Sequence, residues 1–118
     1  MKRNSSNLIN KKVTKAIFGL LANWNKKGFS PRAINTGNCW KFADQLAAKF
    51  PDGSAMWGKQ IAGMFPNGYD PDGHCFFFLA GMFYDSEAPG GVSSPHLLAY
   101  YKRGGYIREG KATCPVSA

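Results

Sequence analysis

A cysteine, a histidine and an aspartate follow one another along this chain as Cys39, His74 and Asp85. A thiol is a strong nucleophile as its thiolate, and an imidazole beside it takes the proton when a carboxylate holds the ring. Cys39 stands where a Gly-Asn turn passes into a helical pattern, whereas His74 and Asp85 stand in two consecutive strand-like runs. These residue types in these settings predict nucleophilic catalysis by a thiol.

The pattern around the cysteine predicts a helix from about Asn38 to Phe50, ended by a Pro-Asp-Gly turn. Its apolar positions recur at helical spacing and share one face: Cys39, Ala43, Leu46, Ala47 and Phe50. Cys39 is therefore expected to face inward from the first turn. There, free backbone N–H groups and the helix dipole stabilise a thiolate.

The histidine and the aspartate belong to a predicted β-hairpin. The runs His74–Leu79 and Met82–Glu87 are rich in strand-forming residues, and a two-residue Ala-Gly connection joins them. In that register His74 and Asp85 are diagonal neighbours on the same face of the hairpin. Glu87 falls directly opposite His74, so it is a rival for the role of orienting the imidazole. A one-residue change in loop length would reverse this facing.

Other segments supply the elements that must position the three residues. Apolar residues at helical spacing predict an amphipathic helix from Asn7 to about Asn25, with lysines on its outer face. Residues 29–35 are expected to be a connector, and residues 57–65 show a weaker helical pattern broken by glycines. Ser94 with the following proline is expected to begin a short helix.

Size and composition indicate one globular domain. The chain has 118 residues, of which 44% are hydrophobic, so we expect a single domain over residues 1–118 with loose ends at 1–6 and 111–118. No apolar stretch is long enough to cross a bilayer. Three cysteines without a Cys-x-x-Cys pair favour neither a disulfide framework nor a zinc site. We expect a cytoplasmic protein that needs no metal or cofactor.

The positive charge is concentrated in one half of the chain. Residues 1–50 carry ten lysines and arginines against the single acid Asp44, a net charge of +9, whereas the remainder is close to neutral. Such an imbalance favours an acidic protein, a membrane surface or nucleic acid as a partner. No nucleic-acid-binding motif is present, so we interpret the lysines first as a solvated helix face.

The segments described above resemble the small papain-like cysteine hydrolases, in particular NlpC-type peptidases and transglutaminase-like proteins of the order Cys, His, Asp. In those families a cysteine begins a helix that packs on an antiparallel sheet, and the strands carry the histidine and its orienting residue. Residues Gly37–Ala43 match the first element, and His74–Phe77 with Phe83–Glu87 match the second. The run Phe83–Val92 is also similar to small uncharacterised proteins of phages and bacteria. The resemblance covers about residues 35–103.

The resemblance implies a role for each candidate. Cys39 would be the nucleophile, His74 the general base and then acid, and Asp85 the residue that orients the ring. Papain-like enzymes place a glutamine several residues before the cysteine as an oxyanion donor, and this chain has none there. We expect the backbone N–H of Cys39, helped by Asn38 or Asn35, to take that place.

These expectations define an α+β, papain-like domain with N-terminal helices on a small antiparallel sheet. Its expected activity is thiol-dependent cleavage or transfer at an amide bond of a peptide or protein, with Trp40 and Glu87 beside the substrate. The alternative is a binding protein that has kept the scaffold and lost turnover. It would be a phage or bacterial inhibitor or effector that docks an acidic protein or nucleic acid through its basic half, in the host cytoplasm if phage-encoded.

Overall fold

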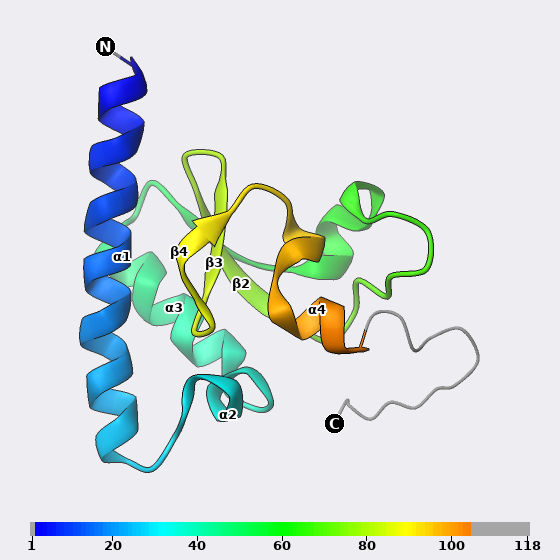
Figure 1. The fold of residues 1–118 in the computed structure, drawn as a ribbon, viewed down its shortest axis with the longest axis horizontal. Coiled ribbons are helices and arrows are strands. Elements are labelled where there is room, and N and C mark those ends of the chain that lie inside the picture. The colour runs from blue at the N-terminus through cyan, green and yellow to red at the C-terminus, as the bar shows by residue number, and fades with distance from the viewer. Residues whose placement is uncertain (1, 105–118) are drawn as a thin grey trace.

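A computed structural model describes residues 2–104 of the chain, and side chains within residues 7–103 (Figure 1). Its helices are α1 (Lys2–Lys26), α2 (Pro31–Asn35), α3 (Cys39–Lys49) and α4 (Ala99–Gly104), with short 3-10 helices η1 (Gly58–Met64) and η2 (Pro95–Leu97). Its strands are β1 (Ser54–Trp57), β2 (Cys75–Leu79), β3 (Met82–Asp85) and β4 (Ala88–Val92). The predicted α+β class is therefore confirmed. The loose end expected at residues 111–118 lies outside the described residues.

The four strands form one antiparallel sheet in the order β1-β2-β3-β4. The central pair has the predicted register, with Phe77 opposite Tyr84 and Leu79 opposite Met82. Ala80 and Gly81 in the turn both have positive φ values, 50° and 82°. A two-residue turn of this kind matches the twist of the strands that it joins. The hairpin and its side-chain facing therefore agree with the prediction.

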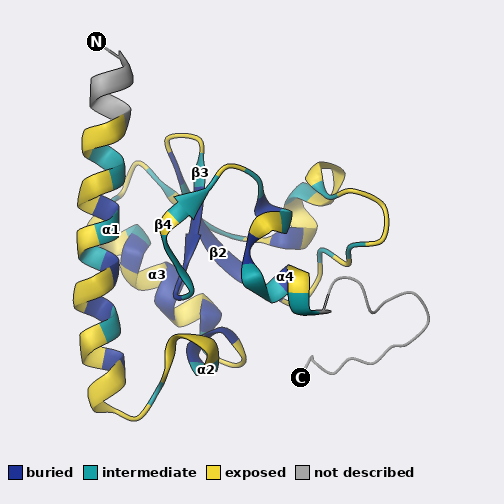
Figure 2. Ribbon diagram, viewed as in Figure 1, coloured by how far each residue is buried: buried dark blue, intermediate teal, exposed yellow. Residues whose placement is uncertain are grey.

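Both faces of the sheet are covered, which explains the unbroken apolar run of β2. Phe77 and Leu79 pack into the cluster formed with α1 and α3. Phe76 packs on the opposite face with Leu98 and Tyr101, from the segment that leads into and forms α4. Figure 2 shows β2 and β3 as the buried centre of the molecule, with exposed residues along the outer side of α1.

The long helix α1 lies along one side of the domain and packs on β4 and α3 (Figure 1). The side chain of Asn10 donates a hydrogen bond to the hydroxyl of Tyr84 at 2.9 Å, and the Thr14 hydroxyl donates one to the carbonyl of Pro89 at 2.7 Å. These two hydrogen bonds fix the rotation of α1 about its own axis and its position along the sheet. The helix also begins earlier than expected, because it includes residues 2–6, for which a loose end was predicted.

Several local predictions were wrong or incomplete. The two edge strands, β1 and β4, were not predicted. The proline and two glycines of β4 are unusual in a strand, but they are tolerated at the edge of a sheet. The weak helical pattern of residues 57–65 corresponds to η1, a 3-10 helix that follows β1. The connector at 29–35 contains α2, which Ser30 caps through a hydrogen bond from the N–H of Ala33 at 3.1 Å. Within residues 2–104 no helix is long and apolar enough to span a membrane.

Candidate active site

Cys39 is the first residue of α3, as predicted, and its thiol points into the fold. The side chain is only 8% exposed and packs with Ala43 and Cys75. The backbone N–H of Cys75 donates to its sulfur at 3.4 Å, and the N–H of Trp40 also interacts with it. Two N–H groups and a helix N-terminus therefore surround the sulfur, an environment that favours the thiolate.

His74 and Asp85 meet at the end of the hairpin, on the same face. Nε2 of His74 lies 2.8 Å from Oδ2 of Asp85, and the two side chains are 0% and 2% exposed. The second carboxylate oxygen, Oδ1, accepts a hydrogen bond from the backbone N–H of Glu87 at 2.9 Å. The carboxylate is thus held from two directions, and it fixes the imidazole in one orientation.

The thiol interacts with the same imidazole. Because Asp85 occupies Nε2, the ring nitrogen left for Cys39 is Nδ1, which is buried and makes no well-aligned hydrogen bond within residues 2–104. The Cys39 and His74 side chains are nevertheless close enough for a hydrogen bond and a charge interaction to shift both pKa values.

The shifts in the pKa values of Cys39 and His74 favour an ion pair between the two side chains. Burial alone raises the pKa of the Cys39 thiol, but the contact with His74 and the two backbone N–H groups outweigh burial and lower it. Burial also lowers the pKa of the His74 imidazole, but the hydrogen bond to Asp85 and the contact with Cys39 outweigh it and raise this pKa. Both shifts increase the population of thiolate and imidazolium.

The neighbouring thiol of Cys75 behaves in the opposite way. Burial, followed by the charges of Cys39 and Asp44, raises the pKa of Cys75 to about 12. Two buried thiols in one cluster therefore differ in chemistry, because only Cys39 has a cationic partner and donated N–H groups. Cys75 is therefore a small packing residue of the core.

Glu87 does not orient His74, contrary to the alternative that the sequence left open. β3 ends at Asp85, and the chain turns at Ser86 and Glu87 into β4, so the position opposite His74 is never reached. The carboxylate of Glu87 instead accepts two hydrogen bonds from the guanidinium of Arg103, at 2.8 and 2.9 Å. Burial raises the pKa of Glu87, but the bonds from Arg103 and Asn35 outweigh it and lower this pKa.

Asn35 also has a different partner from the one expected. Its side-chain amide donates a hydrogen bond to Glu87 at 2.8 Å, and the residue is 2% exposed. A charged carboxylate is a strong acceptor, so this bond holds the amide in the cluster with Glu87. Asn35 therefore supports the turn after Asp85 in this conformation, in place of the oxyanion role expected for it.

The two neighbours of Cys39 in the chain line a common groove. Asn38 precedes α3 and makes no side-chain capping bond, and Trp40 is 46% exposed. Both border an open groove of about 450 Å³ between the C-terminal turn of α1 and the first turns of α3. This volume lies within the range of small-molecule and peptide subsites. Cys39 and His74 are not among the residues that line this groove, so the expectation that Trp40 lies beside the substrate stays a prediction.

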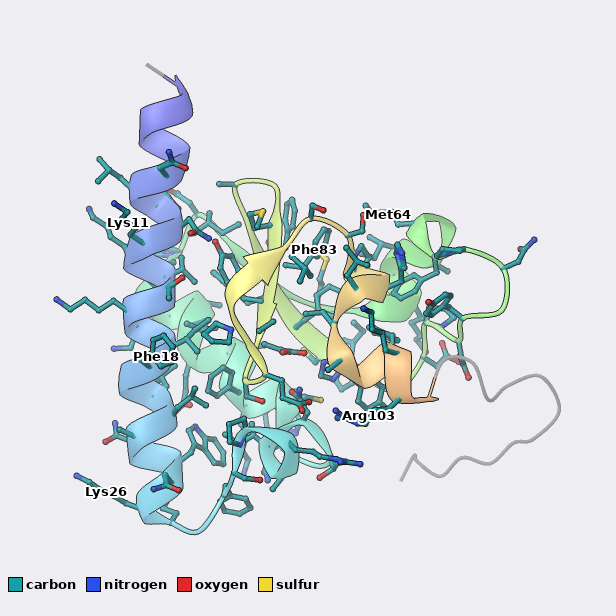
Figure 3. All side chains as sticks on the ribbon, in the orientation of Figure 1. Lys11, Phe18, Lys26, Met64, Phe83 and Arg103 are labelled. Atoms are coloured by element: carbon teal, nitrogen blue, oxygen red, sulfur yellow. The ribbon has the colours of Figure 1, made fainter. Side chains whose placement is uncertain are left out.

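Sequence reasoning missed the residues of α4 that cover the histidine. The ring of Tyr100 stacks on the imidazole with centroids 4.2 Å apart and an interplanar angle of 14°, and Tyr101 meets the imidazole edge-on at 5.5 Å. Arg103 projects from the same helix toward the hairpin turn and binds Glu87 (Figure 3). A pair of adjacent tyrosines is the only local signal, and it does not reveal that they reach a residue some 26 positions earlier.

No group of three or more His, Cys, Asp or Glu side chains in residues 2–104 is arranged to hold a metal ion. The arrangement of Cys39, His74 and Asp85 has the parts for thiol chemistry: a nucleophile with a lowered pKa, a proton acceptor beside it, and a carboxylate that holds the acceptor. Comparisons of the chain with protein-family models, with curated proteins and with solved structures found no match.

Proposed function

We propose that the protein is a thiol-dependent hydrolase that acts on an amide bond of a peptide or protein, as a peptidase, amidase or deamidase. The observation that carries the proposal is the buried chain from the Cys39 thiol through His74 to Asp85, with the 2.8 Å bond between imidazole and carboxylate. A surface cysteine or a core histidine would not need this combination of partners. Perturbed titratable groups that contact one another are typical of catalytic sites.

The proposed reaction has two stages. The thiolate of Cys39 attacks the amide carbonyl, the proton held by His74 passes to the leaving amine, and the C–N bond breaks to leave a thioester. Water then attacks the thioester while His74 takes its proton, and the C–S bond breaks to release the carboxylic acid and restore the thiolate and imidazolium. Asp85 keeps the ring aligned and stabilises the imidazolium that is present in each stage.

The negative charge on the carbonyl oxygen needs donors in both stages. The first N–H groups of a helix have no acceptor within the helix, and that of Cys39 lies next to the nucleophile. The amide of Asn38 is the second candidate, because the residue adjoins Cys39 and its side chain does not cap α3. We therefore assign the oxyanion role to the Cys39 N–H and Asn38, and no longer to Asn35.

The papain-like class of the fold is part of the same proposal. A cysteine at the start of α3, a helix packed on the antiparallel sheet, a histidine directly before β2 and an aspartate at the end of β3 all support it. The cytoplasmic location is also part of the proposal, and it rests on the number and spacing of the cysteines.

A second candidate function is binding without turnover. The exposed face of α1 carries Lys11, Lys12 and Lys15 together with Leu8 and Phe18, each of the last two 57% exposed. Positive charge beside exposed apolar side chains is typical of a surface that docks an acidic partner. His74 is fully buried beneath α4, which a binding protein without catalysis would tolerate.

Alkylation with iodoacetamide separates the two candidates. If Cys39 is held as a thiolate, iodoacetamide should label it about tenfold or more faster than Cys75 at mildly acidic pH, where an ordinary thiol is protonated. Mass spectrometry of proteolytic peptides measures the rate at each cysteine separately. Cys114 serves as an internal reference, although its surroundings lie outside the described residues.

The matched control is His74→Ala. Removing the imidazole should shift the pH profile of Cys39 labelling upward, toward that of an ordinary thiol, and leave Cys75 slow. Equal, slow labelling of all three cysteines in the unmodified protein would reject the hydrolase. Salt-sensitive binding to an acidic protein by such an unreactive chain would then support the second candidate.

A further inference from the structure

The ring of Tyr100 covers one face of the His74 imidazole. The two planes are nearly parallel, at 14°, and their centroids are 4.2 Å apart. At this spacing the face of the tyrosine ring, which carries the negative part of the aromatic quadrupole, lies against the imidazole. The side chain of His74 is fully buried, so water does not compete with this contact.

The side chain of Tyr100 also binds the backbone next to the histidine. Its hydroxyl donates a hydrogen bond to the carbonyl of Gly73 at 3.1 Å. Gly73 has a φ of 89°, and a Cβ atom there would lie 2.9 Å from that hydroxyl. A glycine therefore lets the tyrosine approach the chain directly before His74. One side chain thus holds both the imidazole and the backbone that carries it.

Helix α4 is anchored by two other residues close to Tyr100. Tyr101 is 1% exposed, and its hydroxyl donates a hydrogen bond to the carbonyl of Pro71 at 3.2 Å. The guanidinium of Arg103 donates two hydrogen bonds to the carboxylate of Glu87. These contacts fix the short helix against the rest of the domain. The position of the Tyr100 ring is therefore set by its neighbours in the helix.

A ring stacked in this way acts differently on the two protonation states of the imidazole. The negative face of the tyrosine ring attracts an imidazolium, whereas a neutral imidazole gains only the ordinary contact between rings. The attraction is strongest where water is excluded, as it is around His74. The stack therefore adds to the effects of Asp85 and Cys39, which both favour the imidazolium.

We propose that Tyr100 is a positioning residue of this site, whose ring fixes the orientation of the His74 imidazole and stabilises its positive charge. The proposal rests on the hydrolase proposed above, because a positioned base serves only a reacting thiol. Asp85 holds the imidazole through Nε2, and the stacked ring of Tyr100 keeps it from tilting out of its plane. Nδ1 then remains the nitrogen that is available to Cys39.

The titratable groups packed around the imidazole come from three elements within the described residues. They are the carboxylate of Asp85 in β3, the thiol of Cys39 in α3, and the hydroxyls of Tyr100 and Tyr101 in α4. Both hydroxyls donate to backbone carbonyls, and burial raises the pKa of Tyr101. A substitution at Tyr100 therefore acts on the imidazole through the ring and not through a charge of its own.

Replacing Tyr100 by phenylalanine and by pentafluorophenylalanine compares two rings of similar shape with opposite charge on their faces. Tyr100→Phe should leave the pKa of His74 within about 0.3 unit of that in the unmodified protein, since the ring face is retained. The fluorinated ring should lower this pKa by about 0.5–1 unit relative to Tyr100→Phe, because its face repels a cation. NMR titration of the imidazole C–H signals measures both values, and His96, the other histidine of the chain, is the internal reference.

The reactivity of the thiol should follow the pKa of the imidazole. At mildly acidic pH, iodoacetamide should alkylate Cys39 about three- to tenfold more slowly with the fluorinated ring than with Tyr100→Phe, because the thiolate–imidazolium pair is less populated. Tyr69→Leu is the control for packing, because Tyr69 belongs to the same aromatic cluster but meets His96, edge-on at 5.3 Å. It should change neither the pKa of His74 nor the labelling of Cys39.

The possible contrary results are distinct. Equal His74 pKa values with the two rings, in a protein whose Cys39 is still labelled well ahead of Cys75, would overturn the role of Tyr100 and leave the hydrolase standing. Labelling of Cys39 no faster than Cys75 in the unmodified protein would reject the hydrolase, and the positioning role with it. An effect of Tyr69→Leu as large as that of the fluorinated ring would assign the change to loosened packing and would also overturn the proposal.

Discussion

Asp85 and Glu87 are two residues apart, yet only one of them reaches His74. Asp85 lies within β3 and accepts the imidazole hydrogen bond at 2.8 Å, whereas Glu87 lies in the turn that follows and binds Arg103. The parity of the hairpin predicted the contact between His74 and Asp85 from sequence. Glu87 could not be excluded in the same way, because where a strand ends depends on the partner that it meets.

Exchanging each carboxylate for its amide should separate these roles. Asp85→Asn should lower the pKa of His74 by about one unit or more, because it removes the negative charge that stabilises the imidazolium. Glu87→Gln should leave that pKa nearly unchanged. NMR titration of the imidazole C–H signals measures both, and an equal effect of the two substitutions would contradict the assignment.

The same Glu87→Gln substitution has a pH signature of its own. The pKa of Glu87 is lowered in the folded protein, so the carboxylate stabilises the fold above its unfolded pKa, and this contribution is lost as the pH falls through the folded pKa. We expect Glu87→Gln to cost about 1 kcal/mol near neutral pH, because the ion pair is partly exposed, and less than that near about pH 3. Urea unfolding at the two pH values tests this, and equal losses would rule out the charge as the cause.

At the scale of the element, η1 illustrates how backbone contacts around the site limit side chains. A Cβ atom on Gly58 would lie 2.2 Å from the carbonyl oxygen of Pro71 and from the hydroxyl of Tyr101, whereas one on Gly63 in the same helix would meet nothing within 4 Å. The N–H of Gly58 also donates to the carbonyl of His74 at 3.1 Å. The packing of this 3-10 helix therefore contributes to the placement of the histidine.

Gly58→Ala should destabilise the protein by about 2–4 kcal/mol, since a backbone carbonyl cannot move aside as a flexible side chain would. Gly63→Ala in the same helix should change the free energy of unfolding by less than about 0.5 kcal/mol. Chemical denaturation measures both. A small loss for Gly58→Ala would mean that the loop at Pro71 and helix α4 shift without difficulty.

At the scale of the whole molecule, α1 is an integral part of the core. Ile17 is fully buried beneath the sheet and α3, whereas its neighbour Phe18 is 57% exposed on the outer face of the same helix. Adjacent positions on a helix point in directions about 100° apart, so a buried and an exposed apolar residue can follow one another. This pair provides a direct test of the docking of α1.

Ile17→Ala should lower the free energy of unfolding by about 2–5 kcal/mol, because it removes buried methyl groups and leaves a cavity between α1 and the sheet. Phe18→Ala should change it by less than about 0.5 kcal/mol. Thermal and urea unfolding followed by circular dichroism measure both changes. A small effect of Ile17→Ala would indicate that α1 unfolds separately from the rest.

The amino-acid sequence alone determined the helix that begins at Cys39, the β2–β3 hairpin, and the common facing of His74 and Asp85. Helical periodicity, strand alternation and turn chemistry act over a few residues, so they can be read from the chain directly. Only the tertiary structure decided that Arg103 binds Glu87, that Tyr100 stacks on His74, and that the glycine-rich β4 completes the sheet. Those contacts join residues far apart in the chain, and they depend on how the packed elements meet, which no local pattern specifies.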